Sequence, residues 1–274
     1  MKSTEETTPI LAAEGLSLGF DGRTVVHSLD LAFERGTVTT VIGPNGCGKS
    51  TLLRGLGRLL RPEAGRVTLD GAQIAAMPPR AVACRLSVLP QTPQAPAGLT
   101  VGELVARGRH PRQRWYQQFT GGDERAVSDA LAATDISDLA GVPLEDLSGG
   151  QRQRAWISMT LAQETELLLL DEPTTYLDLA HQVEVLELVQ RLNRELGRTV
   201  VMVLHDISLA ARYSDRIVAM RDGRIVASGT PGEVITPRLL WDVFGLKAQV
   251  IAEPTDGRPH VVPIGGCRVV RAVS

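Results

Sequence analysis

Three short apolar runs along the chain predict buried strands. The runs are continuous and do not alternate with polar residues, which is typical of strands covered on both faces of a parallel sheet. They lie at 38–42, 167–170 and 200–204. Polar residues follow each run at once: a glycine-rich loop at 43–50, then Asp171-Glu172, then His205-Asp206. Because ligands of open α/β sheets bind beyond the carboxyl ends of the strands, we expect these polar groups to share one edge of the sheet.

Helical spacing and capping signals occupy the chain between the first two runs. Thr100 and Glu103 have the spacing of a capping box, which marks the start of a helix. Apolar residues then recur at helical spacing at positions 126, 127, 130 and 131. These signals predict an inserted helical subdomain. A further amphipathic helix follows the second run and ends at Gly197, with one apolar face made of Val185, Val189, Leu192 and Leu196.

Two Asp-Gly pairs predict tight hairpins. Asp70-Gly71 and Asp222-Gly223 each separate short β-type segments, and Asp-Gly is a strong signal for a two-residue hairpin turn. An antiparallel β layer should therefore accompany the parallel sheet. Near the end of the chain, the runs 249–251 and 260–262 flank a Pro/Gly-rich turn and predict one more hairpin.

Together these elements predict an α/β fold with a parallel sheet core, an antiparallel β layer and an inserted helical subdomain. The length of 274 residues suits a single domain with an insertion. We expect this domain at 9–247, with its core over about 9–91 and 164–247 and the helical subdomain over about 92–163. Residues 248–274 form a C-terminal tail that contains the last predicted hairpin.

Composition excludes several classes of protein. The net charge is −2, with 43% hydrophobic and 22% charged residues, which excludes a disordered chain and a globally basic nucleic-acid binder. No apolar run approaches the roughly 18 residues that a membrane-spanning helix needs. The polar, acidic start over 1–9 lacks the pattern of a secretory signal, so we expect a cytoplasmic location. Three cysteines at unrelated spacings, Cys47, Cys84 and Cys267, predict free thiols.

The loop from Gly43 to Ser50 fits the phosphate-binding loop pattern in full. Its glycines let successive backbone N–H groups point at phosphate oxygens, Lys49 reaches the β- and γ-phosphates, and the Ser50 hydroxyl can ligate Mg²⁺. A strand precedes the loop and an apolar helix start, Leu52-Leu53, follows it, as this motif requires. The alternative is a glycine-rich turn between strand and helix, but it does not account for the lysine and the serine.

The other two strand ends carry groups suited to phosphate chemistry. Asp171 can hold the Mg²⁺ shell, and Glu172 can polarise an attacking water as general base. His205 can hydrogen-bond a γ-phosphate. Each has a structural alternative, because acidic strand ends are common and a histidine is often satisfied by backbone or faces solvent. The phosphate-binding loop in the same chain favours the functional interpretation.

The segment Leu147-Ser148-Gly149-Gly150-Gln151 carries two signals at once. Ser148 and Gln151 satisfy an ordinary capping box at the start of a helix. The box does not explain two consecutive glycines, which cost helix stability unless something must approach the backbone closely. A second phosphate-binding helix end is the interpretation that we favour.

In combination, these motifs resemble those of the ATP-binding subunits of ABC transporters over nearly the whole chain. In the family's order, the matching elements are a Walker A loop at Gly43–Thr51, a Q-loop at Gln91, a signature at Leu147–Gln151, a Walker B strand at Leu167–Glu172, a D-loop at Asp178 and a switch histidine at His205. The resemblance implies a P-loop NTPase core of the RecA-like type that uses ATP and Mg²⁺.

The resemblance also implies roles for individual residues. The catalytic residues would be Glu172, His205, Gln91 and Lys49. The Mg²⁺ ligands would be Ser50, Gln91 and Asp171. The nucleotide would contact Phe20, Gly43, Pro44, Asn45, Gly46, Cys47, Gly48, Lys49, Ser50, Thr51, Ser148, Gly150, Gln151 and Asp178. Phe20 lies where the family stacks an aromatic ring, usually Tyr, on adenine; the alternative for Phe20 is a core residue beside a turn.

For partners, the resemblance implies a head-to-tail dimer of two copies of the chain. Each ATP would lie between the Walker motifs of one copy and Ser148 and Gly150 of the other. ATP binding would close the dimer, hydrolysis would reopen it, and Gln91 and the helical subdomain would pass the motion to transmembrane permease subunits. An extracytoplasmic substrate-binding protein would act with them. The chain would then be a peripheral subunit on the cytoplasmic face of the membrane, and no nucleic-acid partner is expected.

Several segments resemble one importer subclass, that for ferric siderophores, haem and cobalamin. They are Gly108–Pro111, Gln113–Tyr116, Thr174–Asp178 and Ala180–Gln182. The Trp115-Tyr116 pair favours ferric siderophores, and its alternatives are helix packing or contact with a membrane subunit. Import of cobalamin or haem is the next hypothesis.

Other classes of nucleotide-binding protein fit the sequence less well. Non-transport ABC ATPases serve DNA repair, translation or iron–sulfur assembly, but repair types insert long coiled coils and translation types fuse two ATPase units. A regulatory protein without turnover would be expected to lose Glu172 or His205. A phosphate-loop kinase would lack the segment 148–151. ATP-driven import is therefore the favoured hypothesis.

Overall fold

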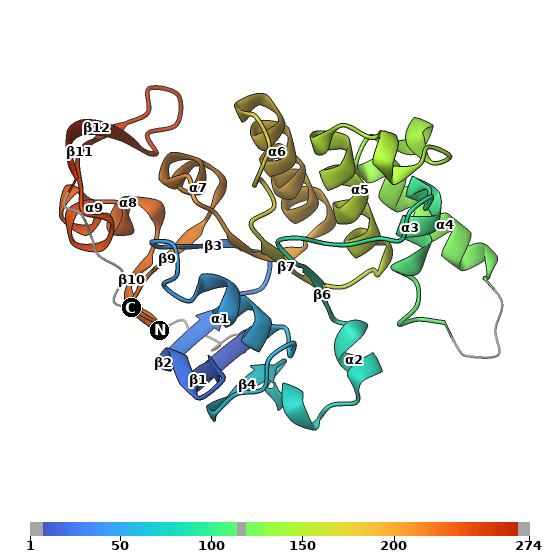
Figure 1. Ribbon diagram of the computed structural model, residues 1–274, viewed down its shortest axis with the longest axis horizontal. Coiled ribbons are helices and arrows are strands. Elements are labelled where there is room, and N and C mark those ends of the chain that lie inside the picture. Colours follow the sequence, from blue (N-terminus) through green and yellow to red (C-terminus); the bar gives the residue numbers. More distant parts are fainter. Residues whose placement is uncertain (1–7, 114–118, 268–274) are drawn as a thin grey trace, which may run out of the picture. The chain divides into compact units, whose positions relative to one another are not determined.

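A computed structural model describes residues 8–113 and 119–267 of the protein (Figure 1). The chain divides into two compact units. Unit 1 comprises Met1–Met77 and Val203–Ser274, and unit 2 comprises Pro78–Met202. Each unit contains its own strands, helices and buried apolar side chains.

The first sheet of unit 1 is antiparallel. Its strands are β1 (Leu11–Phe20), β2 (Arg23–Phe33), β4 (Ala64–Leu69) and β5 (Ala72–Gln73), in the order β2-β1-β4-β5. The predicted hairpin joins β4 and β5. Asp70 and Gly71 both have positive φ, 52° and 76°, which is the conformation of a two-residue type I′ turn.

A second group of strands in unit 1 contains the first of the three apolar runs. The strands β3 (Val38–Ile42), β9 (Arg216–Arg221) and β10 (Arg224–Gly229) lie in the order β10-β9-β3. β3 runs parallel to β9 and is buried along its whole length, as predicted. β9 and β10 are antiparallel, and the turn between them has Asp222 and Gly223 at φ values of 49° and 72°.

The described part of unit 1 also contains helices and a terminal hairpin. The helices are α1 (Lys49–Leu56), α7 (Ile207–Tyr213), α8 (Pro231–Val234), α9 (Pro237–Phe244) and the short 3-10 helix η1 (Ile74–Ala76). The strands β11 (Leu246–Ala252) and β12 (Pro259–Cys267) pair antiparallel, which confirms the hairpin predicted for the tail. This hairpin packs against α7 and α9 (Figure 1).

Arg258 fastens the terminal hairpin to α7. Its guanidinium donates to the carbonyl oxygens of Ala211, Arg212 and Ser214, at 3.1, 2.5 and 2.9 Å. Arg212 in turn forms an ion pair with Glu253. The carbonyl groups at the end of α7 are therefore satisfied by a basic side chain, the type of residue that a helix C-terminus favours.

Unit 2 contains the other two apolar runs. Its strands β6 (Leu86–Leu89), β7 (Leu167–Asp171) and β8 (Thr199–Val203, the last residue of which belongs to unit 1) lie in the order β8-β7-β6. β6 and β7 are parallel. β7 and β8 are buried along their whole lengths, so both predicted strands are confirmed, and β8 begins and ends one residue before its apolar run.

Unit 2 contains the helices predicted after Thr100, over 126–131, after Ser148 and before Gly197, together with short helices that were not predicted from the sequence. They are α2 (Pro79–Ala83), α3 (Val101–Arg107), α4 (Gly121–Ala133), the 3-10 helices η2 (Ser137–Leu139) and η3 (Leu144–Asp146), and α5 (Gly149–Ala162), with α6 (Leu179–Leu196) after β7. α3, α4 and α5 pack on one another (Figure 1). Each of these three begins with a capping box, at Thr100, Thr120 and Ser148.

One apolar position predicted for the buried face of α6 is wrong. Val185, Val189 and Leu192 are buried, but Leu196 is 50% exposed. Leu196 is the last residue of the helix, and Gly197, with a φ of 62°, turns the chain directly after it. The buried face of α6 therefore ends one turn before the helix does.

Two expectations from composition can be compared with the described residues. Cys47 and Cys84 are free thiols, as predicted, and the side chain of Cys267 lies outside the described part of the chain. Within residues 8–113 and 119–267, no helix is long and apolar enough to cross a lipid bilayer.

Candidate functional site

The phosphate-binding loop connects β3 to α1 in unit 1. Gly48 is the N-cap of α1 and has a φ of 101°, which a residue with a Cβ rarely adopts. Pro44 is half-buried and Asn45 and Gly46 are exposed, so the loop is accessible. Within the described chain, no side chain caps this helix start. A glycine-rich loop at an uncapped helix N-terminus is suited to bind an anion through its N–H groups.

Lys49 is buried at the base of this loop, with 5% of its surface exposed. Its Nζ donates to the carbonyl oxygens of Gly43 and Pro44, at 2.9 and 3.0 Å. Ser50 and Thr51 follow in the first turn of α1. All the loop residues predicted to contact nucleotide, 43–51, therefore lie in one loop and one helical turn. A phosphate group would be a stronger partner for the ammonium than a neutral carbonyl.

The hairpin turn between β9 and β10 supports the loop. The Gly223 N–H donates to the Cys47 carbonyl at 3.0 Å, and the His27 N–H donates to the Gly223 carbonyl at 3.0 Å. A Cβ on Gly223 would lie 2.0 Å from the Val25 carbonyl oxygen, so only glycine fits. The Asp222-Gly223 pair predicts this hairpin but no functional role, because nothing local to the pair indicates that it contacts a loop so distant in the chain.

The Cys47 side chain is buried within unit 1. Burial raises the pKa of the Cys47 thiol, and the neighbouring Lys49 charge offsets this only in part. The thiol is therefore neutral at physiological pH and a poor nucleophile. Cys47 contributes to the loop through its backbone, since its N–H donates to the Pro44 carbonyl at 3.3 Å.

Phe20 and His205 are the other predicted site residues of unit 1. Phe20 ends β1 and is 44% exposed, so the alternative of a core phenylalanine is wrong. Its ring is available to a planar ligand. His205 is exposed and precedes Asp206, the N-cap of α7, whose carboxylate accepts a hydrogen bond from the Leu209 N–H at 2.7 Å. The start of α7 thus fixes the backbone next to His205.

In unit 2, the predicted catalytic carboxylate lies in a hydrogen-bond cluster. Asp171 and Glu172 are both buried at the end of β7. The Gln91 amide nitrogen donates to Glu172 Oε2 at 2.6 Å, and the Thr175 hydroxyl donates to the same oxygen at 2.9 Å. Gln91 and Glu172 were predicted from separate motifs and are in direct contact. The two donors fix the orientation of the Glu172 carboxylate.

The backbone at Glu172 is unusual for a residue with a side chain. Its φ is 54°, in the left-handed region, where non-glycine residues are uncommon and often belong to functional sites. The following turn is closed by the Thr175 N–H, which donates to the Glu172 carbonyl at 3.2 Å. Thr175 has no predicted role from the sequence. The signal that would have indicated one is a hydroxyl placed three residues after the general base.

The start of α5 has the geometry that the signature segment predicts. The Gln151 N–H donates to the Ser148 hydroxyl at 3.3 Å, and the Ser148 N–H donates to the Gln151 side-chain oxygen at 3.0 Å. This confirms the capping box. Ser148 is exposed, whereas Gly150 is buried. The close approach expected at the glycines occurs at Gly150, where the neighbour is the ring of His181.

Asp178 is the N-cap of α6. Its Oδ1 accepts hydrogen bonds from the backbone N–H of His181 at 2.9 Å and from His181 Nδ1 at 2.7 Å. These two bonds lower the pKa of the Asp178 carboxyl below its ordinary value. The Gln182 side-chain amide donates to the Leu177 carbonyl at 2.9 Å. His181 therefore links two predicted site residues, Asp178 and Gly150.

The importer-like segment Gly108–Pro111 contains a buried ion pair. Arg109 Nε lies 2.8 Å from Asp123 Oδ1, and Arg109 Nη1 lies 2.6 Å from Glu164 Oε2. Desolvation acts to lower the pKa of Arg109, but the two carboxylates outweigh it and raise the pKa above the ordinary value. Arg109 thus ties α3 to α4 and α5. Trp115 and Tyr116, the pair that favours ferric siderophores, lie outside the described residues.

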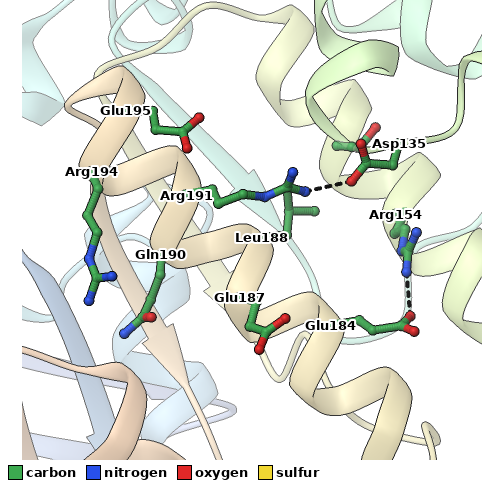
Figure 2. Close-up of a pocket in the computed structure, with 10 residues that line it drawn as sticks. Asp135, Arg154, Glu184, Glu187, Leu188, Gln190, Arg191, Arg194 and Glu195 are labelled. Carbon is green, nitrogen blue, oxygen red and sulfur yellow. Dashed lines mark hydrogen bonds and ion pairs between the residues drawn. The ribbon is translucent and has the colours of Figure 1, made fainter. Parts of the chain in front are cut away.

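A groove of about 520 Å³ lies along the polar face of α6 in unit 2. Figure 2 shows Arg154 directed at Glu184 and Arg191 directed at Asp135, and both pairs are ion pairs. None of the predicted site residues lines this groove. Its mixed charges join α6 to its neighbouring helices, and we do not place the functional site there.

Sequence comparisons identify related proteins. A family model described as ABC transporter matches residues 26–175. The chain is 49% identical to the iron(3+)-hydroxamate import ATP-binding protein FhuC of Bacillus subtilis, over 91% of this chain and 93% of that protein. It is 48% identical to the ferric enterobactin transport ATP-binding protein FepC of Escherichia coli, over 95% and 96%. It is 39% identical to the hemin import ATP-binding protein HmuV of Thermobifida fusca, over 94% and 89%.

Solved structures show the same fold. One is cbiO1 of Clostridium perfringens, part of the ABC transporter complex cbiONQ, with a TM-score of 0.75 and 29% identity over 86% of this chain and 94% of that one. Another is MJ0796, a bacterial ABC transporter cassette in dimeric form, with a TM-score of 0.70 and 26% identity over 80% and 98%. The predicted P-loop NTPase fold is therefore confirmed.

Proposed function

Because the chain belongs to the ABC transporter family, we propose that it is the ATP-hydrolysing subunit of an importer that takes up ferric siderophores across the cytoplasmic membrane. The observation that carries the substrate class is the identity of 48–49%, over more than nine-tenths of the chain, with subunits named for iron-hydroxamate and ferric enterobactin transport. The buried Lys49 and the hydrogen-bonded Glu172 support turnover by this chain.

ATP binds at the start of α1 in this proposal. The loop N–H groups donate hydrogen bonds to the phosphates, and the dipole of α1 favours their negative charge. The Lys49 ammonium exchanges the carbonyls of Gly43 and Pro44 for the β- and γ-phosphates. The exposed ring of Phe20 stacks on adenine. Charge-assisted hydrogen bonds to phosphate are stronger than bonds to carbonyls, which favours the exchange.

Hydrolysis requires a water aligned with the γ-phosphorus. Glu172 accepts a proton from this water as its oxygen attacks, and the leaving group is ADP. Gln91 and Thr175 hold the carboxylate in place through Oε2. His205 hydrogen-bonds the γ-phosphate, where negative charge is spread over the equatorial oxygens during transfer.

The donor set also suits Mg²⁺. Ser50, Gln91 and Asp171 offer a hydroxyl, an amide oxygen and a carboxylate, which are the hard oxygen ligands that Mg²⁺ prefers. Because Gln91 uses its amide nitrogen toward Glu172, its amide oxygen is the atom suited to a cation. The bound ion would neutralise charge on the phosphates.

Two copies of the chain form the working ATPase in this proposal. Ser148, Gly150, Gln151 and Asp178 of one copy contact the ATP held by the Walker motifs of the other. The exposed Ser148 at the N-terminus of α5 is suited to a phosphate, and the related cassette MJ0796 has been solved as a dimer. Transmembrane permease subunits and an extracytoplasmic binding protein complete the importer, with this chain on its cytoplasmic side.

Haem import is the second candidate. The hemin import protein HmuV is 39% identical to the chain, lower than either ferric-siderophore relative, which places haem after siderophores.

Uptake by cells tests the proposal. Cells whose only copy is wild-type, Glu172→Gln or Glu187→Gln are given iron-hydroxamate, ferric enterobactin, cobalamin or haem, each labelled. Glu187 is an exposed carboxylate of α6, so Glu187→Gln is the matched control for the loss of a charge. We expect Glu172→Gln to abolish uptake of one or both iron compounds and Glu187→Gln to retain it. Loss of cobalamin or haem uptake alone would contradict the substrate class, and unchanged uptake of all four would contradict the import function.

A further inference from the structure

The start of α5 and the start of α6 meet in unit 2 at one histidine ring. A Cβ built on Gly150 would lie 2.5 Å from Cδ2 of His181, 3.1 Å from Cγ and 3.3 Å from Nε2. Non-bonded carbon atoms pack at about 3.5–4.0 Å. The imidazole therefore occupies the space that a side chain at position 150 would need.

The ring is held in that place by Asp178. The Asp178 carboxylate accepts from the His181 backbone N–H and from Nδ1, at 2.9 and 2.7 Å, and its lowered pKa keeps it an acceptor. Gln182 fixes the turn before α6 through the Leu177 carbonyl. Movement of the ring away from a Cβ at position 150 would strain the hydrogen bond from Nδ1 to Asp178.

The adjacent glycine is not constrained in this way. A Cβ on Gly149 would have its nearest contact at 3.4 Å, with Leu177 Cδ2, which is an ordinary van der Waals distance. The requirement for glycine is therefore specific to position 150, and His181 imposes it from within the same chain.

We propose that His181 is a positioning residue that fixes the signature segment of α5 relative to Asp178. This inference rests on the proposed function, in which Ser148, Gly150 and Asp178 contact the ATP of the second copy. His181 touches Gly150 and Asp178 and acts on ATP only through them. Its loss should lower kcat and leave the KM for ATP nearly unchanged, because Lys49 and its loop belong to the other unit.

Paired variants separate this role from a general effect on folding. His181→Ala removes both the hydrogen bond to Asp178 and the atoms that face Gly150. His181→Asn keeps an amide donor near the place of Nδ1 and an oxygen near the place of Cδ2. Each is combined with Gly150→Ala, and Gly149→Ala with and without His181→Ala is the neighbouring control.

The expected pattern is a rescue. Gly150→Ala should lower kcat by about 10²-fold, since small displacements of positioned groups have effects of this size. His181→Ala should lower kcat by about 10-fold, and the double variant Gly150→Ala/His181→Ala should be faster than Gly150→Ala alone. Gly150→Ala/His181→Asn should stay as slow as Gly150→Ala. His181→Asn alone should be more active than His181→Ala.

The opposite pattern would overturn the proposal. If His181→Ala does not raise the kcat of Gly150→Ala, the glycine serves some other contact and the ring does not impose it. If His181→Ala rescues Gly149→Ala equally well, the effect is not specific to position 150. A rise in the KM for ATP of His181→Ala that is as large as the fall in its kcat would likewise contradict a role confined to turnover.

A measurement without nucleotide keeps this test separate from that of the proposed function. In NMR spectra, the ring proton signals of His181 can be assigned by their loss in His181→Ala. These signals should shift in Gly150→Ala and keep their positions in Gly149→Ala. Thermal unfolding should show the same coupling, because alanine favours a helix over glycine and only the collision would lower the Tm of Gly150→Ala. Unshifted His181 signals would refute the contact, whereas failure of the wild-type protein to drive uptake would refute only the import function.

Discussion

At the scale of single residues, the candidate site consists of buried charges that already have polar partners. Burying a charge is costly unless hydrogen bonds compensate for the lost water. Lys49 has the carbonyls of Gly43 and Pro44, and Glu172 has Gln91 and Thr175. The Glu172 carboxylate, held by two donors to Oε2, therefore needs little reorganisation when the reaction begins, which is the basis of electrostatic catalysis.

Glu172→Gln should retain ATP binding and lower turnover by about 10² or more, because the general base is lost while the amide keeps an oxygen for Gln91 and Thr175. Thr175→Val, which removes only one donor to Oε2, should cause a smaller loss. Steady-state ATPase assays and an ATP-binding titration measure the two effects. Equal ATPase rates in Glu172→Gln and wild type would contradict the role of the base.

Lys49→Ala should remove tight ATP binding, because the phosphates lose their charged partner. Its partners are two backbone carbonyls of the loop, and the substitution leaves no charge without a partner, so the fold should remain. Isothermal titration with ATP measures the affinity, and circular dichroism controls for folding. Unchanged affinity in a folded variant would show that Lys49 does not contact the nucleotide.

Sequence motifs predicted the residues with intrinsic chemistry but not the residues that hold them. Lys49, Glu172 and His205 were identifiable because each follows a buried strand. Thr175 and His181 were not, because a hydroxyl or an imidazole near a helix start has many ordinary roles. The contact of His181 with Gly150 joins two helices and cannot be derived from local spacing.

At the scale of elements, hairpins and caps connect the site to the scaffold. The β9–β10 turn donates a hydrogen bond to the phosphate-binding loop. The capping box of α4 uses Asp123, which also pairs with Arg109. The first contact joins two backbone groups and the second joins two side chains, and each ties the position of one element to that of another.

The two Asp-Gly hairpins offer a matched comparison. Gly71 and Gly223 have similar φ values, 76° and 72°, so alanine is strained at both. A Cβ at Gly71 has its nearest contact at 3.8 Å, whereas at Gly223 it lies 2.0 Å from a carbonyl oxygen. Gly223→Ala should therefore weaken ATP binding by about 10-fold through displacement of the loop, and Gly71→Ala should only lower the Tm. Equal ATP affinities in the two variants would contradict the support of the loop by this turn.

The buried pair Arg109–Asp123 predicts a pH dependence of stability. Desolvation acts to raise the pKa of Asp123, but the hydrogen bonds from Arg109 and Thr120 and the Arg109 charge outweigh it, so the pKa lies below its ordinary value. The stabilisation is thus present above the unfolded pKa of about 3.9 and is lost as pH falls through the lower folded pKa.

Asp123→Asn should lower the free energy of unfolding by about 3 kcal/mol at pH 7, because Arg109 loses a buried partner. The difference from wild type should begin to shrink below about pH 4, where Asp123 becomes protonated in the unfolded chain, and should shrink further as pH falls through the lowered pKa of the folded state. Urea denaturation at several pH values measures both. A difference that stays constant down to pH 2 would refute the assignment of the acid-sensitive stability to this carboxylate.

Most elements were predictable because their signals are local. The three buried strands, the Asp-Gly turns and the capping boxes at Thr100 and Ser148 follow from periodicity and turn chemistry. Leu196 was misassigned because a helical apolar pattern does not reveal where the packed surface ends. The neighbours of each strand depend on contacts between distant segments and required the structure.

At the scale of the whole molecule, neither unit holds the complete set of candidate residues. Unit 1 contains Phe20, the phosphate-binding loop and His205, and unit 2 contains Gln91, Glu172, the signature segment and Asp178. In the proposed function, turnover therefore uses residues of both units and the signature segment of a second copy.

Ser148→Arg should prevent ATP-dependent dimerisation while each separate chain still binds ATP, because a long side chain would fill the space for the phosphates of the other copy. Thr100→Arg removes an equivalent capping box at the start of α3 and controls for the loss of a cap, about 1 kcal/mol. Dimerisation is measured by light scattering in the presence of ATP. Every variant also carries Glu172→Gln, which slows turnover so that the bound ATP is retained. Normal dimerisation of Ser148→Arg would refute the contact in trans.

The hydrogen bonds from Arg258 to the end of α7 limit how far the chain can be truncated from its C-terminus. α7 begins two residues after His205, and the carbonyls at its other end are held by a side chain in the terminal hairpin. A truncation before residue 258 removes this anchor and loosens the helix that follows the histidine, even though the cut is far from it along the chain. In the proposed function, we therefore expect an active fragment to extend past residue 258, beyond the region that contains every recognisable motif.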